Sequence, residues 1–166
     1  MITTERCVLV QLQESDFNDI EKLYINSEVR KYLGGTIDKE TFEGNFSDML
    51  NVKEDTFNWV VREKINNELI GLTSLHPSHD GTCTEVSYQL LPKWWGNGFA
   101  TEAVGSVIHF AFTELNLSSL IAETQVLNLP SRSLLEKLGM KLDKKTMRFG
   151  AEQAIYCIER NNYVQK

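Results

Sequence analysis

The chain has 166 residues, of which 42% are hydrophobic and 24% charged, and its formal net charge is −6. A chain of this length buries about two-thirds of the surface that its unfolded form exposes, so the composition predicts one globular domain over residues 1–166 without a metal or disulfide. The acidic charge disfavours nonspecific nucleic-acid binding, and no run of about 18 apolar residues could cross a membrane.

The N-terminus has no basic segment followed by an apolar one, so we expect a cytoplasmic protein. The cysteines are odd in number and widely separated, which favours reduced thiols over a disulfide framework; they are Cys7, Cys83 and Cys157.

The first half of the chain alternates between strand and helix patterns. Arg6–Gln13 predicts a strand, and Ser15-Asp16 offers a cap for a helix through Tyr24. Another helix is expected from Asp38 or Thr41 toward Leu50. Three antiparallel strands should follow, with the first turn at Asn66-Asn67, over Phe57–Glu63, Leu69–Leu75 and Cys83–Leu91.

From Gly98 the hydrophobic period changes to that of a helix of about four turns. Leu120–Leu127 then predicts a strand, and this strand–helix–strand unit requires a parallel pairing. A short helix should begin at Pro130 and end at Gly139, followed by strands near Lys141–Phe149 and Glu152–Glu159. The pattern predicts an α+β fold with a mixed, mostly antiparallel central sheet of six to seven strands flanked by helices.

Between the third strand and the long helix lies the turn Trp-Trp-Gly-Asn-Gly-Phe-Ala-Thr-Glu-Ala, residues 94–103. Gly96 and Gly98 carry no Cβ, so the backbone can turn tightly and present N–H groups to an anion at the start of the next helix. The turn therefore predicts a phosphate-binding site.

Three segments together resemble the GNAT acyltransferases, and among them the RimJ/RimL-type ribosomal-protein N-terminal acetyltransferases. They are Glu85–Leu90, Trp95–Ala103 and Asn128–Met140. Trp95 stands where the general GNAT pattern has Gln or Arg, which is usual in this branch. The resemblance implies acetyl-CoA as cofactor, with its pyrophosphate held by the backbone of Gly96, Asn97, Gly98, Phe99, Ala100 and Thr101.

The resemblance also implies two neighbouring strands that splay apart at the cofactor site. The pantetheine arm would then contact the main chain of Leu90 and Leu91. Asn128 would hydrogen-bond the pantetheine or a water, and Ser131 would lie near the thioester sulfur. Both residues are equally suited to cap the short helix.

The implied chemistry is direct acetyl transfer to a primary amine, either a protein N-terminal α-amine or a small-molecule amine. The amine must lose its proton before it attacks. Glu85 is the candidate general base; the alternative is that Glu85 is an exposed carboxylate without a catalytic role. The resemblance suggests Ser131 as the acid that returns a proton to the leaving thiolate. Two aromatic residues in the first half of the chain, Tyr32 and Trp59, are candidate contacts of the acceptor amine, with a place in the hydrophobic core as the alternative. Glu85 is a further candidate contact of the acceptor.

Two other function classes remain open. A noncatalytic acyl-CoA sensor would keep the turn without transfer, and a dinucleotide-binding oxidoreductase would use the turn with Glu123 at a ribose, although the glycine pattern is incomplete. His76, His79 and Cys83 lack a fourth partner at a metal-site spacing, so no metal is expected. The acceptor stays open, as does the choice between monomer and homodimer.

Overall fold

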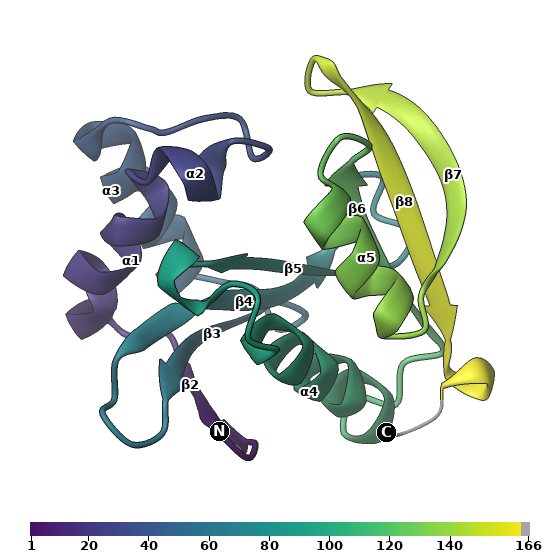
Figure 1. The fold of residues 1–166 in the computed structure, drawn as a ribbon, viewed down its shortest axis with the longest axis horizontal. Helices are drawn as coiled ribbons and strands as arrows, with labels where there is room; N and C mark the ends of the chain where they lie inside the picture. The colour runs from purple at the N-terminus through teal and green to yellow at the C-terminus, as the bar shows by residue number, and fades with distance from the viewer. Residues whose placement is uncertain (164–166) are drawn as a thin grey trace.

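The computed structural model describes residues 1–163. Eight strands form one sheet in the order β1-β2-β3-β4-β5-β6-β8-β7 (Figure 1). The strands are β1 (Ile2–Thr3), β2 (Cys7–Gln11), β3 (Phe57–Glu63), β4 (Leu69–Pro77), β5 (Thr84–Leu90), β6 (Ser119–Gln125), β7 (Lys141–Arg148) and β8 (Ala151–Glu159).

The α-helices of the described residues are α1 (Phe17–Tyr24), α2 (Ser27–Arg30), α3 (Lys39–Leu50), α4 (Phe99–Thr113) and α5 (Leu129–Lys137). Short 3-10 turns occupy Glu14–Asp16, Pro92–Trp94 and Arg160–Asn162. The predicted start of α3 is confirmed, because the Asp38 side chain accepts a hydrogen bond from Thr41 N at 2.7 Å and so satisfies a free N–H of the first turn.

Two hydrophobic cores lie on the two faces of the sheet. β3 contributes to both, because successive strand residues point to opposite faces. Trp59 and Val61 belong to the core that contains α4, whereas Val60 belongs to the core that contains α1 and α3. Figure 1 shows α1, α2 and α3 gathered at one side of the molecule, away from α5, β7 and β8.

The strand–helix–strand unit β5–α4–β6 has the predicted parallel pairing. Only one residue pair, Glu85 and Ile121, is in register between β5 and β6, whereas every residue of β5 has a partner in β4. Beyond Glu85 the two strands diverge, as Figure 1 shows. The splayed pair that the family resemblance implied is therefore present.

The structure corrects the sequence prediction in three places. The sheet has eight strands instead of six to seven, because the two-residue β1 pairs with β2 and is too short to show a period. The one-turn helix α2 was not predicted. Cys83 precedes β5 and is only half-buried, whereas Cys7 is fully buried. Within residues 1–163, the longest and most apolar helices still fall short of what a membrane span requires.

Candidate active site

The glycine turn between β5 and α4 has the left-handed backbone that the sequence predicted. Gly96 has φ +74° and Gly98 has φ +82°, a region that residues with a Cβ rarely adopt. Gly98 is also the residue that precedes the first turn of α4. The two glycines therefore set the direction in which the chain enters the helix.

The main-chain N–H groups from Gly96 to Thr101 have no hydrogen-bond acceptor within residues 1–163. The next N–H along the chain, that of Glu102, donates to the Gly98 carbonyl at 3.0 Å and begins the hydrogen bonding of the helix. Free N–H groups at a helix start, together with the positive end of the helix dipole, favour a bound anion. The turn thus fits a pyrophosphate without any side-chain cation of its own.

Arg6, directly before β2, supports this turn from a distant part of the chain. Its Nη1 donates to the carbonyl of Asn97 at 2.9 Å, and its Nε pairs with Glu102 at 2.8 Å. Its guanidinium also lies over the ring of Phe99, 4.1 Å from the centroid. Sequence analysis missed Arg6, because nothing local relates it to a turn 91 residues away.

The end of β5 is fixed by two tryptophans. Trp94 Nε1 donates to Leu69 O at 2.8 Å, and Trp95 Nε1 donates to Leu90 O at 2.9 Å. Leu91 N donates to Ile70 O at 2.9 Å. The N–H of Leu91, one of the two residues expected to contact the pantetheine, is therefore already hydrogen-bonded to β4. By the alternation of strand hydrogen bonds, the Leu90 N–H points away from β4, toward the gap before β6.

A glycine allows β4 and β5 to lie this close. A Cβ on Gly71 would collide with the carbonyl oxygen of Gln89 and would lie 2.9 Å from the Cα of Leu90. Both contacts are with backbone, which cannot rotate out of the way. Gly71 therefore helps to position the main chain of Leu90 at the splayed edge.

Asn128 and Ser131 lie together at the start of α5. Asn128 Oδ1 accepts a hydrogen bond from Ser131 N at 3.3 Å, so the capping role is present. The Ser131 hydroxyl is 2.6 Å from the hydroxyl of Tyr88 on β5. This pair bridges the two sides of the gap. Burial raises the pKa of Tyr88 to about 12, so its phenol stays protonated at neutral pH.

Glu85 lies where β5 and β6 are still paired, at the closed end of the gap. Burial raises the pKa of its carboxyl group, and the Glu123 carboxylate acts in the same direction while His76 opposes it. The ring of His76 is 3.2 Å from the Ser87 hydroxyl. Glu85 is thus a half-buried carboxylate beside like charge, not the exposed one of the alternative interpretation.

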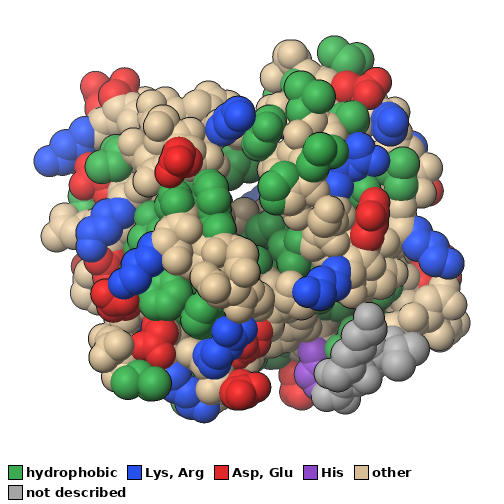
Figure 2. Space-filling view, in the orientation of Figure 1, with side chains coloured by type: hydrophobic (Ala, Val, Ile, Leu, Met, Phe, Trp, Pro, Cys, Tyr) green, Lys and Arg blue, Asp and Glu red, His purple; other side chains and the backbone are tan. Residues whose placement is uncertain are grey.

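A cavity of about 430 Å³ lies on the α1–α3 side of β5. Figure 2 shows a hollow in the middle of the molecular surface, with hydrophobic side chains around it. The residues that line the cavity are Tyr24, Arg30, Leu33, Asp48, Met49, Val52, Thr56, Asn58, Leu72, Ser74, His76, Ser87, Tyr88 and Gln89. Because Tyr88 belongs both to this lining and to the pair with Ser131, the cavity reaches the splayed strands.

The expected acceptor contacts are not all at this cavity. Trp59 is 5% exposed and stacks on Phe57 with ring centroids 5.4 Å apart, in the core under α4. Its side chain therefore lies on the opposite face of the sheet, which does not support a substrate contact. Tyr32 and Glu85 lie outside the cavity lining, whereas Tyr24 is part of it.

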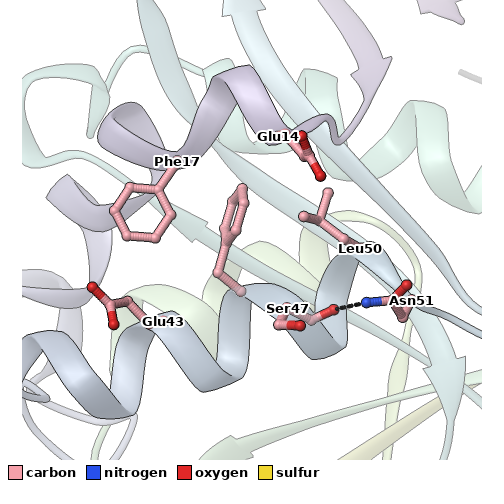
Figure 3. A pocket seen from close by; sticks show the side chains of 7 residues that line it. Glu14, Phe17, Glu43, Ser47, Leu50 and Asn51 are labelled. Carbon is pink, nitrogen blue, oxygen red and sulfur yellow. Dashed lines mark hydrogen bonds between the residues drawn. The ribbon is translucent and has the colours of Figure 1, made fainter.

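A second cavity, of about 580 Å³, lies between the start of α1 and α3 (Figure 3). Phe17 and Leu50 line it together with the carboxylates of Glu14 and Glu43. No residue of β5, of the glycine turn or of α5 takes part, so it is separate from the candidate site. Residues 1–163 contain no group of three or more His, Cys, Asp or Glu side chains arranged for a metal ion.

Comparison with known proteins agrees with this geometry. Residues 6–141 match the family described as "Acetyltransferase (GNAT) domain". The chain belongs to the GNAT acetyltransferase family. It is therefore an acyltransferase, and the expectations of the GNAT family, of its fold and of acetyl-CoA as cofactor are confirmed.

A sequence relative supports the same assignment, and two solved structures share the fold. "Uncharacterized N-acetyltransferase YoaA" of Bacillus subtilis is 27% identical over 151 residues, which are 85% of this chain and 82% of that protein. A GNAT-family acetyltransferase from Bacillus anthracis has a TM-score of 0.84 at 24% identity, covering 96% and 98% of the two chains. A spermidine N-acetyltransferase from Vibrio cholerae, solved with CoA and spermine, has a TM-score of 0.80 at 20% identity, covering 95% and 98%.

Proposed function

We propose that this acetyltransferase transfers an acetyl group from acetyl-CoA directly to a primary amine, either a protein N-terminal α-amine or the amine of a small molecule. The observation that carries the proposal is the junction of two features at the splayed strands. One is the turn with six free N–H groups, and the other is the cavity that ends at Tyr88.

The cofactor would be held by the protein main chain. The N–H groups from Gly96 to Thr101 would bind the pyrophosphate, and the outward N–H of Leu90 would bind the pantetheine arm. The side-chain oxygen of Asn128 accepts the hydrogen bond from Ser131 N, so the side-chain NH₂ group remains to bind the pantetheine arm. Acetyl-CoA supplies an acetyl thioester, and no cysteine of the protein needs to act as a nucleophile.

The side chains near the gap would handle the protons. Glu85, with its raised pKa, would take a proton from the incoming ammonium, through a water or through Ser87 and His76, which face the cavity from the same side of the sheet. Ser131 Oγ would give a proton to the leaving thiolate. The Tyr88 hydroxyl, 2.6 Å from Ser131 Oγ, would orient that serine and replace its proton.

The test is incubation of the protein with acetyl-CoA and a panel of peptides, amino acids and polyamines, with release of free thiol as the readout. We expect thiol release that depends on one class of amine, and mass spectrometry should find the acetyl group on that amine. The variants Glu85→Gln and Ser131→Ala should lower kcat with little change in CoA affinity. CoA binding without acceptor-dependent thiol release would instead favour the sensor.

We further propose membership of the RimJ/RimL-type branch, because Trp95 and the Asn128–Met140 segment follow its pattern. We also propose a cytoplasmic enzyme, with residues 1–166 as one domain, that acts as a monomer or homodimer without nucleic acid. β5, the strand before the turn, is antiparallel to its neighbour β4, whereas the dinucleotide-binding fold has a mostly parallel sheet; this pairing argues against the dinucleotide-binding alternative.

A further inference from the structure

The cavity beside β5 contains a positive charge, that of Arg30, which forms no ion pair with an acidic side chain of residues 1–163. Arg30 is half-buried in the lining of this cavity. Burial lowers the pKa of Arg30, which is the expected effect of desolvation without a compensating acid. A buried charge of this kind is costly unless something pairs with it.

The guanidinium of Arg30 is nevertheless held in one position. Nε donates to Gly35 O at 2.9 Å, Nη2 donates to Leu33 O at 2.7 Å, and the group lies 4.9 Å from the ring centroid of Tyr24. A longer contact of 3.4 Å joins Nη1 to Gln89 Oε1. A guanidinium has five N–H donors, so one on Nη1 and one on Nη2 remain for a ligand. Two such donors match the two oxygens of a carboxylate.

The rest of the lining argues against a polycationic acceptor. Asp48 is the one acidic residue in this lining, and it is exposed, so water screens its charge. The apolar part of the lining could receive an aliphatic or aromatic group; it consists of Leu33, Met49, Val52 and Leu72.

The position of Arg30 relative to the gap is also suitable. Arg30 and Tyr88 line the same cavity, and Gln89, which Arg30 contacts, directly follows Tyr88 in β5. Tyr88 in turn contacts Ser131 at the proposed transfer site. A small molecule could therefore place one end at Arg30 and its amine at the splayed strands.

We propose that the acceptor is an amine that also carries a carboxylate, of the class of free amino acids, and that Arg30 binds this carboxylate. The inference rests on the proposed acetyl transfer for its kinetic consequence, but the binding site can be tested without turnover.

The experiment compares L-leucine, L-methionine and L-phenylalanine with their carboxamides and with the corresponding amines that lack the carboxyl group. Binding to the CoA-saturated protein is measured by calorimetry, and acetyl transfer is measured by thiol release. We expect at least one amino acid to bind and react about ten- to a hundredfold better than its carboxamide, the range that a charge-assisted hydrogen bond corresponds to.

Arg30→Gln should bring the ratio of amino acid to carboxamide close to one, and Arg30→Lys should keep part of it. Lys31→Gln is the matched control, because it removes a neighbouring positive charge that is exposed and outside the cavity lining. An unchanged CoA affinity in Arg30→Gln will show that the variant is folded.

The outcomes separate the two proposals. Equal or better binding of the carboxamides or of the amines, or an unchanged ratio in Arg30→Gln, would overturn the assignment of Arg30. Arg30-dependent binding of amino acids without thiol release from any amine would support the site and refute the proposed transfer. Absence of both binding and thiol release would refute both.

Discussion

Replacement of Gly98 by alanine tests whether the turn before α4 binds the cofactor. The residue has φ +82°, so an alanine there should destabilise the fold by about 1–2 kcal/mol, the cost of the left-handed region for a residue with a Cβ. The new methyl group would also lie 3.3 Å from Arg6 Nη2, the side chain that supports the turn. The strained backbone would also disturb the arrangement of the free N–H groups from Gly96 to Thr101.

If these groups bind the pyrophosphate, loss of one charge-assisted hydrogen bond should weaken CoA binding about ten- to a hundredfold. Isothermal titration with CoA measures this, and thermal unfolding measures the strain. Gly150→Ala is the control, because Gly150 also has a left-handed φ of +74° with open space around it, in the β7–β8 turn far from the site. It should lower the Tm to a similar degree and leave CoA affinity unchanged. Equal CoA affinity in Gly98→Ala and the wild type would refute the assignment.

Three other substitutions test the rest of the site. Gly71→Ala should lower the free energy of unfolding by about 1–3 kcal/mol in a melting experiment, because its methyl group would collide with β5. The control Gly44→Ala, which has open space around it in α3, should raise that free energy by about 0.5–1 kcal/mol. Equal effects of the two substitutions would refute the close approach of β4 and β5. Tyr88→Phe removes the hydroxyl that is hydrogen-bonded to Ser131. It should lower kcat about tenfold or more in a thiol-release assay, with little change in the KM for acetyl-CoA. An unchanged kcat would exclude the phenol from proton transfer. The raised pKa of Glu85 means that the folded protein binds this proton more tightly than the unfolded chain, so its stabilising contribution is present at acid pH and is lost as pH rises through the folded-state pKa. Glu85→Gln should therefore raise the Tm at pH 7–8 relative to the wild type, with a smaller gain near the ordinary carboxyl pKa of about 4.3. It should also remove the acid limb of the pH–rate profile. A gain in Tm that did not change with pH would contradict the raised pKa of Glu85.

The order and type of the main elements were predictable because their signals are local. The change from alternation to a helical period at Gly98 marked α4, and Asp38, a residue type that favours the position before a helix, marked the start of α3. The left-handed turn was predictable from Gly96 and Gly98 for the same reason, since φ depends on the residue itself. The strand at residues 2–3 and the four-residue helix α2 were not predicted, because segments this short show no hydrophobic period.

The contacts across the site depended on tertiary structure. Tyr88 and Ser131 are 43 residues apart, and Arg6 is 91 residues from the turn that it supports. No local pattern relates such pairs. The face on which Trp59 lies was equally undetermined, because β3 is buried on both faces and its apolar run has no period that distinguishes them.

The sequence by itself determined the longer helices and strands, the glycine turn and, through three motifs, the family and its cofactor. Backbone conformation is set by neighbouring residues, so these features can be read along the chain. Only the tertiary structure decided which side chains meet in the gap between β5 and β6. Within residues 1–163 it left Arg30 without an ion-pair partner in the cavity beside β5, and it paired Tyr88 with Ser131. Both arrangements arise from packing between elements that are remote in the sequence.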